Sequence, residues 1–185
     1  MSKKKLVLTY PNLRWHKLDV QTVWNLNPSI LCLLGKMVED DVDVTIIDAQ
    51  FYDLTLDEFK NKIAEVDPDY VGISMLTSEY APILHDAALA VKSVKDQTIV
   101  IAGGVHVTIE HQAVIADGNI DYAVRGEGEY TLQKLVRFLN GTGEFPTQGL
   151  VFREKGRIVT QKQSYIEDLS ALPMPDYNLV TMEDY

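Results

Sequence analysis

Cysteine is nearly absent from this sequence, since Cys32 is the only one among its 185 residues. A single thiol excludes an intrachain disulfide. It also excludes an iron–sulfur cluster held by cysteines of these residues alone. Cys32 lies in the apolar run 30–34, which is typical of a small, buried hydrophobic side chain. The sequence therefore predicts no redox or metal chemistry through its own cysteine.

Basic residues are also scarce. The chain has 17 Lys and Arg against 27 Asp and Glu, which gives a formal net charge of −10. Nucleic-acid binding needs clustered cations against the phosphates, so we expect no nucleic-acid partner. The one basic run, residues 3–5, precedes an apolar segment and is typical of a solvated strand end.

Long apolar runs are missing as well. No stretch approaches the roughly 20 residues of a membrane span, so we expect no membrane partner. The apolar run 6–11 after the first lysines is too short for the core of a signal peptide. These absences lead us to expect a cytoplasmic protein, and the 46% hydrophobic composition is ample for a folded core.

What the sequence does contain is a repeated alternation of strand and helix patterns. Short, β-branched and nearly continuous apolar runs indicate parallel strands buried on both faces, at residues 5–10, 42–48, 70–74, 98–102 and 122–125. Amphipathic helical patterns lie between and after them, at residues 28–39, 55–66, 80–94, 108–116 and 129–139. This alternation predicts an α/β fold with a doubly wound five-stranded parallel sheet, flavodoxin-like, in the order 2-1-3-4-5.

The pattern changes after residue 140. Two β-rich runs, 150–153 and 157–160, flank the turn sequence Glu154-Lys155-Gly156 and predict a β-hairpin. Residues 164–185 contain Pro173 and Pro175 and are typical of a linker. We therefore divide the chain into an α/β domain at 1–146, a C-terminal β-hairpin at 147–163 and a linker at 164–185.

Ligands of open α/β sheets bind beyond the carboxyl ends of the strands. The segments at those ends supply the candidate binding residues, which are Ser74, Met75, Leu76, Thr77, Gly103, Gly104, Val105, His106, Gly126 and Glu127. Two adjacent glycines would let a bulky ligand lie against the backbone. A tight strand-to-helix turn explains the glycine pair equally well, and the sequence leaves both interpretations open.

Other ligands of doubly wound folds fit less well. The segment from Gly126 superficially resembles a dinucleotide fingerprint, but it follows the fifth strand and has Thr131 in place of the third glycine. Its acidic residues, Glu127 and Glu129, would also simply stabilise a helix N-terminus. A response-regulator receiver would need an acidic residue where Ser74 stands, so this class is disfavoured as well.

The ordered set of motifs resembles the cobalamin-binding domains that precede radical S-adenosylmethionine cores. The resemblance runs from the first strand to the C-terminus, through segments 27–30, 44–49, 68–74, 101–108, 120–129, 148–156 and 169–177. It implies a base-off cobalamin whose nucleotide tail enters the sheet edge. The segment 74–77 would line that tail, Gly103 and Gly104 would make room for it, and the Gly126-Glu127 turn would close the same side.

The same resemblance implies a larger enzyme. A radical S-adenosylmethionine domain in the same full-length chain would follow the linker, with its Cys-x-x-x-Cys-x-x-Cys motif, a 4Fe-4S cluster and S-adenosylmethionine. We expect the 185 residues to bind rather than to catalyse, and the whole protein to be a methyltransferase or an oxidative-cyclase-like enzyme. Two alternatives stay open. One is a cofactor-free domain of this fold that mediates assembly with the catalytic domain, and the other is a small α/β enzyme or nucleotide-binding domain in its own right.

One departure from related cobalamin domains concerns cobalt. Domains of the methionine-synthase kind carry Asp-x-His-x-x-Gly after the first strand, and their histidine binds the metal. The loop 11–27 lacks that motif, and its only histidine is His16, between Trp15 and Lys17. We therefore expect His16 to be a surface residue, and His106 to make a polar contact at a helix start.

Overall fold

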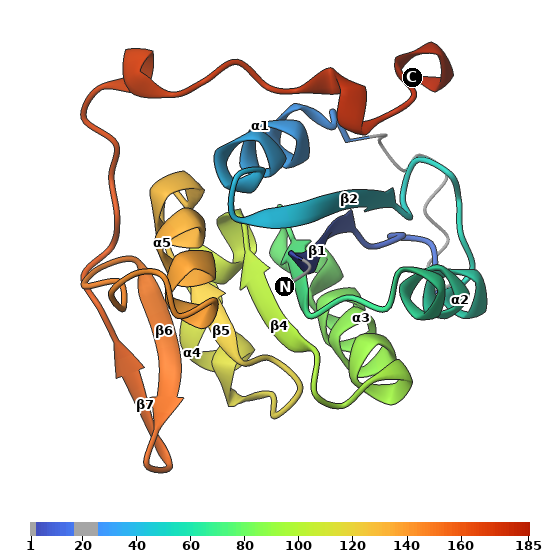
Figure 1. Ribbon diagram of the computed structural model, residues 1–185. Helices are drawn as coiled ribbons and strands as arrows, with labels where there is room; N and C mark the ends of the chain where they lie inside the picture. Colours follow the sequence, from blue (N-terminus) through green and yellow to red (C-terminus); the bar gives the residue numbers. More distant parts are fainter. Residues whose placement is uncertain (1–2, 17–25) are drawn as a thin grey trace.

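The computed structural model describes residues 3–16 and 26–185. Its strands form one sheet in the order β2-β1-β3-β4-β5-β6-β7 (Figure 1). The strands are β1 Lys4–Tyr10, β2 Val42–Asp48, β3 Tyr70–Ser74, β4 Ile99–Gly103, β5 Tyr122–Val124, β6 Leu150–Glu154 and β7 Arg157–Thr160. The first five are parallel. The predicted five-stranded parallel order is therefore confirmed.

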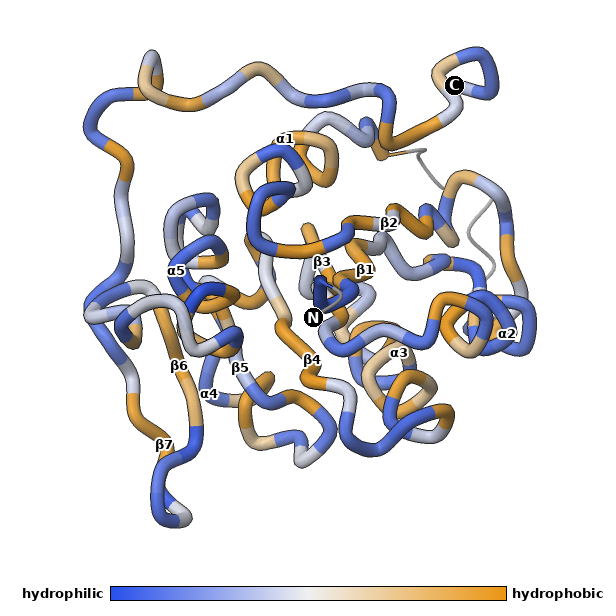
Figure 2. The backbone as a smooth tube through the Cα atoms, viewed as in Figure 1, coloured by the Kyte–Doolittle hydropathy of each residue, from blue (hydrophilic) through white to orange (hydrophobic). Residues whose placement is uncertain are grey.

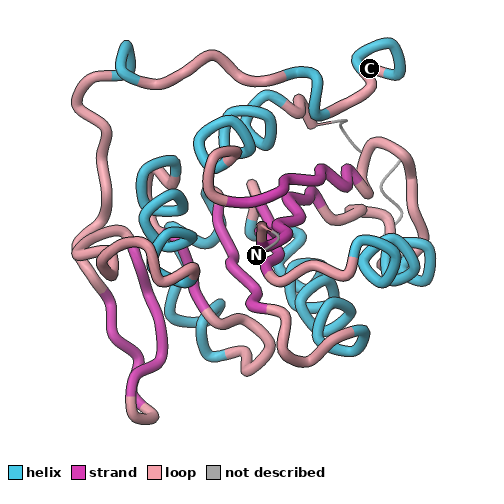
Figure 3. The backbone as a smooth tube through the Cα atoms, viewed as in Figure 1, coloured by secondary structure: helices cyan, strands magenta, loops and turns pink. Residues whose placement is uncertain are grey.

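Helices cover both faces of this sheet (Figure 3). They are α1 Ser29–Val38, α2 Leu56–Val66, α3 Ala81–Val94, α4 Val105–Ala116 and α5 Glu129–Leu139. Apolar residues of α1 and α5 pack with Leu6 and Leu8 of β1, whereas residues of α2, α3 and α4 pack with Val7 on the opposite face. Successive side chains of a strand point to opposite faces. The central strands β3 and β4 therefore contribute side chains to both cores and are mainly apolar, as Figure 2 shows.

The predicted hairpin is present, but it is part of the sheet rather than a separate extension. β6 pairs antiparallel with β5, and β7 pairs antiparallel with β6, so the sheet has seven strands instead of five. The Arg153 guanidinium donates hydrogen bonds to the carbonyls of Asp117 (3.0 Å) and Ile120 (2.7 Å) before β5. An unpaired β5 would expose its backbone polar groups, and the hairpin satisfies them.

The segment predicted as a linker crosses one end of the domain and lies against α1 and the end of β2 (Figure 1). The hydroxyls of Tyr177 and Ser29 are 2.7 Å apart, which joins the segment to the start of α1. Tyr185 donates a hydrogen bond of 2.8 Å to Asp48 and stacks on Phe51 with ring centroids 3.9 Å apart. Short 3-10 turns at Leu169–Ala171, Tyr177–Leu179 and Met182–Asp184 are its only regular elements. Within residues 3–16 and 26–185, no helix is both long and apolar enough to cross a bilayer.

Candidate functional site

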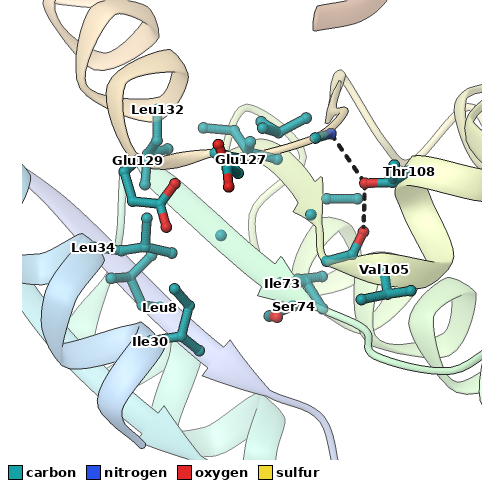
Figure 4. Close-up of a pocket in the computed structure, with 18 of the residues that line it drawn as sticks. Leu8, Ile30, Leu34, Ile73, Ser74, Val105, Thr108, Glu127, Glu129 and Leu132 are labelled. Atoms are coloured by element: carbon teal, nitrogen blue, oxygen red, sulfur yellow. Dashed lines mark hydrogen bonds between the residues drawn. The ribbon is translucent and has the colours of Figure 1, made fainter. Parts of the chain in front are cut away.

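A groove lies between α1 and α5 on one face of the sheet. Contacts hold the C-terminal part of α1 against α5: Gln133 Nε2 donates to the Met37 carbonyl (2.6 Å), and Arg137 Nε lies 2.8 Å from Asp41 Oδ2. Between the N-terminal parts of the two helices there is instead a groove of about 440 Å³. Its walls carry Ile30 and Leu34 from α1 and Leu132 from α5 (Figure 4). The walls are therefore mainly apolar.

Two glycines shape the floor of this groove. The floor is formed by residues 72–74 of β3 and 101–103 of β4. Along these strands Ile73 and Ala102 direct their side chains into the core of the opposite face, and the residues on either side of each face the groove. A Cβ atom at Gly72 would lie 2.8 Å from Leu8 Cδ2, so this position admits no side chain without movement of Leu8. Apart from its chain neighbours, the nearest atom to a Cβ atom at Gly103 would be Val124 Cβ, at 3.9 Å. Gly103 thus leaves space that a side chain would otherwise occupy.

Gly104 serves a different purpose. Its φ of +101° is a conformation that side chains disfavour, and a Cβ atom there would lie 2.4 Å from the Met75 carbonyl oxygen. That carbonyl accepts a hydrogen bond from His106 N (3.2 Å), while Met75 N donates to Gly103 O (2.9 Å). The two backbones therefore approach too closely for any residue but glycine. A tight strand-to-helix turn therefore explains the glycine at position 104. The glycine at position 103 instead leaves room in the groove.

The loops after β4 and β5 are tied together at the groove mouth. The Thr108 hydroxyl donates to Gly104 O (3.1 Å) and accepts from Gly126 N (3.0 Å), as the dashed lines in Figure 4 show. Glu127 N donates to Ser164 O (3.1 Å), and the Glu127 carboxylate accepts from Ile166 N. The segment after the hairpin thus closes one side of the groove, to which Gln163 and Tyr165 contribute.

A profile of the B12 binding domain family matches residues 26–136, which is more than half of the chain. The chain belongs to the B12-binding domain family. An uncharacterized methyltransferase of Pyrococcus horikoshii is 34% identical over 161 residues, which are 85% of this chain and 35% of that protein. The anaerobic magnesium-protoporphyrin IX monomethyl ester cyclase of Rubrivivax gelatinosus is 27% identical over an alignment of 191 positions, gaps included, which covers 98% of this chain and 34% of the cyclase. The chain spans about a third of the length of these curated relatives.

Solved structures show the same fold. The cobalamin-dependent radical enzyme OxsB, with aqua-cobalamin and S-adenosylmethionine bound, superposes with a TM-score of 0.75 at 17% identity over 96% of this chain and 24% of OxsB. The radical S-adenosylmethionine methyltransferase TsrM of Kitasatospora setae, with cobalamin and a 4Fe-4S cluster bound, gives 0.71 at 19% identity over 95% of this chain and 32% of TsrM. The predicted flavodoxin-like fold is thereby confirmed. The predicted cofactor, cobalamin, agrees with the B12-binding family to which the chain belongs.

Seven of the ten predicted site residues of this B12-binding domain line the groove. They are Ser74, Leu76, Gly103, Gly104, Val105, Gly126 and Glu127. Val105 and His106 belong to α4, which begins three residues before the predicted helix start at residue 108. The structure therefore brings the ends of β3, β4 and β5 together as expected.

The other three predicted residues do not line the groove. Met75 is buried in the core on the opposite face, because it alternates with Ser74. The Thr77 hydroxyl accepts from Glu79 N (3.3 Å) and caps the short turn Ser78–Tyr80. His106 is buried, with its Nδ1 atom 2.9 Å from the Ser78 hydroxyl. We assigned these three residues to the site because they are adjacent to lining residues in the sequence. Their side chains, however, point away from the groove.

Most of the apolar lining was not predicted from the sequence. The residues missed are Leu8, Ile30, Leu31, Leu34, Gly72, Ile73, Ile101, Ala102, Thr108, Val124, Gly128, Glu129, Leu132, Gln163 and Tyr165. The period of two, counted back from Ser74 and Gly103, would have identified Gly72 and Ile101. No comparable signal identifies the α1 residues, because their pattern is that of any core helix.

His16 of the partly described loop 11–27 contacts the Asp86 carboxylate of α3 through its Nε2 atom, and its side chain is 42% exposed. This arrangement agrees with the predicted surface position. The rest of the loop, residues 17–25, lies outside the described residues.

We expect His106 to make stability depend on pH. Burial, and secondarily the charge of nearby His85, hold the pKa of His106 below its usual 6.5, although Glu110 opposes this. As pH falls, the unfolded chain therefore binds a proton at this histidine before the folded chain does. The free energy of unfolding is unaffected by the titration of His106 above about pH 6.5 and decreases progressively below it. Unfolding free energies measured in urea between pH 7.5 and 5 should fall less in His106→Gln than in the parent. Equal slopes would contradict this expectation.

Proposed function

We propose that this domain binds cobalamin in the base-off form, with the nucleotide tail in the groove between α1 and α5. The observation that carries the proposal is the space above Gly103, in a groove whose walls are apolar and whose mouth lies at the carboxyl ends of β3, β4 and β5. Ligands of this fold bind at that edge. The membership of the B12-binding family supports the identity of the ligand.

The groove suits the tail rather than the whole cofactor. Its volume of about 440 Å³ is in the range of small-molecule pockets, roughly 300–1,000 Å³, and is too small for a corrin ring with its side chains. A flat aromatic base would be held by Ile30, Leu34 and Leu132, and polar parts of the tail would meet Ser74 at the mouth. The corrin ring would then lie outside the groove, against the carboxyl edge of the sheet.

We propose further that cobalt receives no ligand from His16. The Nε2 atom of this histidine is already directed to Asp86, a residue of α3 on the sheet face opposite α1 and α5. When bound, cobalamin supplies a cobalt centre that can carry a methyl group. The residues described here bind and orient the tail.

The whole protein is proposed to be a radical S-adenosylmethionine enzyme, either a methyltransferase or an oxidative-cyclase-like enzyme. The names of the relatives from P. horikoshii and R. gelatinosus support these two reaction classes. The 4Fe-4S cluster and S-adenosylmethionine would be bound by a further domain of the full-length chain. Cys32, a buried residue of α1, cannot supply the three cysteines of the cluster motif.

The decisive test is whether the chain retains cobalamin through its tail. After mixing with hydroxocobalamin and desalting, we expect the protein to keep a corrin absorption band of the base-off type. Cobinamide, which lacks the nucleotide tail, should bind at least about tenfold more weakly, because it buries no aromatic base in the groove. Loss of all colour would instead support the cofactor-free assembly domain. Equal retention of cobinamide would contradict the tail-binding groove.

A further inference from the structure

Glu129 differs from the other residues that line the groove. It is the first residue of α5, and Figure 4 shows its carboxylate turned across the groove toward Leu34. The Oε2 atom of Glu129 is buried and has no hydrogen-bond partner among residues 3–16 and 26–185. A buried carboxylate oxygen without a donor costs free energy. The groove thus contains a strong acceptor that the described protein residues leave unsatisfied.

Two neighbouring polar side chains of the groove, Thr108 and Glu127, are already engaged. The Thr108 hydroxyl both donates to Gly104 O and accepts from Gly126 N. The Glu127 carboxylate accepts from Ile166 N. These hydrogen bonds connect the loops to one another, whereas Glu129 Oε2 makes no hydrogen bond to any of the described residues. A structural role at the start of α5 would be met by any acidic side chain directed to solvent, as Asp57 is in the first turn of α2.

We infer that Glu129 accepts a hydrogen bond from a donor on the buried nucleotide of the corrinoid, and that it selects corrinoids with such a donor. The inference rests on the proposed function, because it assumes that the tail occupies this groove. The donor is an O–H or N–H group, and it has two chemical sources. One is a ribose hydroxyl, which every complete corrinoid carries, and the other is an amino or hydroxyl group on the lower base.

The physical basis is the cost of desolvation. A ligand that fills the groove removes the remaining water from around the carboxylate, so a donor at this point is needed to offset the loss. Hydrogen bonds to charged groups contribute enough to change an equilibrium by about tenfold or more. Dimethylbenzimidazole has no N–H or O–H group once it is joined to ribose, whereas adenine and 5-hydroxybenzimidazole each retain one. The lower base is therefore a variable that separates the two sources.

The experiment measures binding of four probes by calorimetry: cobalamin, the 5-hydroxybenzimidazolyl and adeninyl corrinoids, and cobinamide. The proteins are the parent chain, Glu129→Gln, Glu129→Leu and the matched control Asp57→Leu, which removes an exposed first-turn carboxylate of α2. Thermal unfolding of each variant is recorded separately. We expect Glu129→Leu to lose about tenfold or more in affinity for the complete corrinoids that carry the donor and nothing for cobinamide. Glu129→Gln keeps an acceptor oxygen and should lose less, and Asp57→Leu should bind like the parent.

The outcomes distinguish the sources. An equal loss for all three complete corrinoids assigns the donor to the ribose. A preference of the parent for the two donor-bearing bases, which Glu129→Leu abolishes, assigns it to the base. Parent-like binding of every probe by Glu129→Leu, or an equal loss for cobinamide, would overturn the inference while the proposed function stands. Failure of the parent to bind any complete corrinoid would contradict the proposed function itself.

Discussion

Gly103→Leu is expected to reduce cobalamin affinity by at least about 100-fold while the domain stays folded. The added side chain starts at a Cβ position whose nearest neighbour outside residues 102–104, Val124 Cβ, is 3.9 Å away. It would extend into the groove from the same face of β4 as Ile101, where the nucleotide tail is proposed to lie. Because the Cβ atom would make only an ordinary van der Waals contact and the groove beyond it is open and mainly apolar, the free energy of unfolding should change by only about 1 kcal/mol or less.

Gly118→Leu is the matched control for this substitution. Gly118 lies in the exposed turn between α4 and β5, and a Cβ atom there would meet nothing within 4 Å. It should bind cobalamin like the parent. Affinities are measured by calorimetry or by the corrin absorption change, and folding by circular dichroism and urea denaturation. If Gly103→Leu is folded and binds cobalamin as tightly as Gly118→Leu, the tail does not pass over Gly103.

The second large effect concerns stability. Gly104→Ala is expected to lower the free energy of unfolding by about 3 kcal/mol or more. Two costs combine at this position, namely a φ of +101° and a methyl group 2.4 Å from the Met75 carbonyl oxygen. The contact is with backbone, so no side-chain rotation relieves it. Relief would have to separate the end of β3 from the start of α4, where His106 N donates to Met75 O.

Gly141→Ala separates these two costs. Gly141 has a φ of +72°, but a Cβ atom there would meet nothing within 4 Å. It therefore carries the conformational cost alone, about 1–2 kcal/mol for a left-handed residue. Urea denaturation of both variants measures the difference. Equal destabilisation by the two substitutions would show that the approach of Met75 to Gly104 has no energetic consequence.

Taken together, these variants assign different tasks to adjacent glycines. Gly103→Leu tests space for a ligand in a domain of nearly unchanged stability, and Gly104→Ala tests the geometry of the turn that begins α4. A sequence pattern of two glycines at a strand end does not separate these tasks. They separate only because Gly103 still belongs to β4 and faces the groove, whereas Gly104 is the residue that turns the chain into the helix.

The sequence alone was sufficient for the layers of the fold. Apolar runs such as 70–74, with helical periods after them, predicted the parallel order, because both periods are local and burial on two faces needs continuous apolar strands. It also located the carboxyl edge of the sheet, and through Ser74, Gly103 and Gly126 the mouth of the groove. The turn at Lys155 and Gly156 likewise predicted the hairpin.

Tertiary structure alone decided what that hairpin pairs with and which side chains the groove contains. The backbone groups at the edge of β5 form hydrogen bonds with β6, although the helix α5 lies between the two strands in the sequence. Leu34 and Glu129 come into one groove because contacts such as Gln133 with Met37 set the spacing of α1 and α5. Met75 and His106, in contrast, point away from the groove. Local periods determine that a residue is buried, but the spacing of elements far apart in the chain determines what it is buried against.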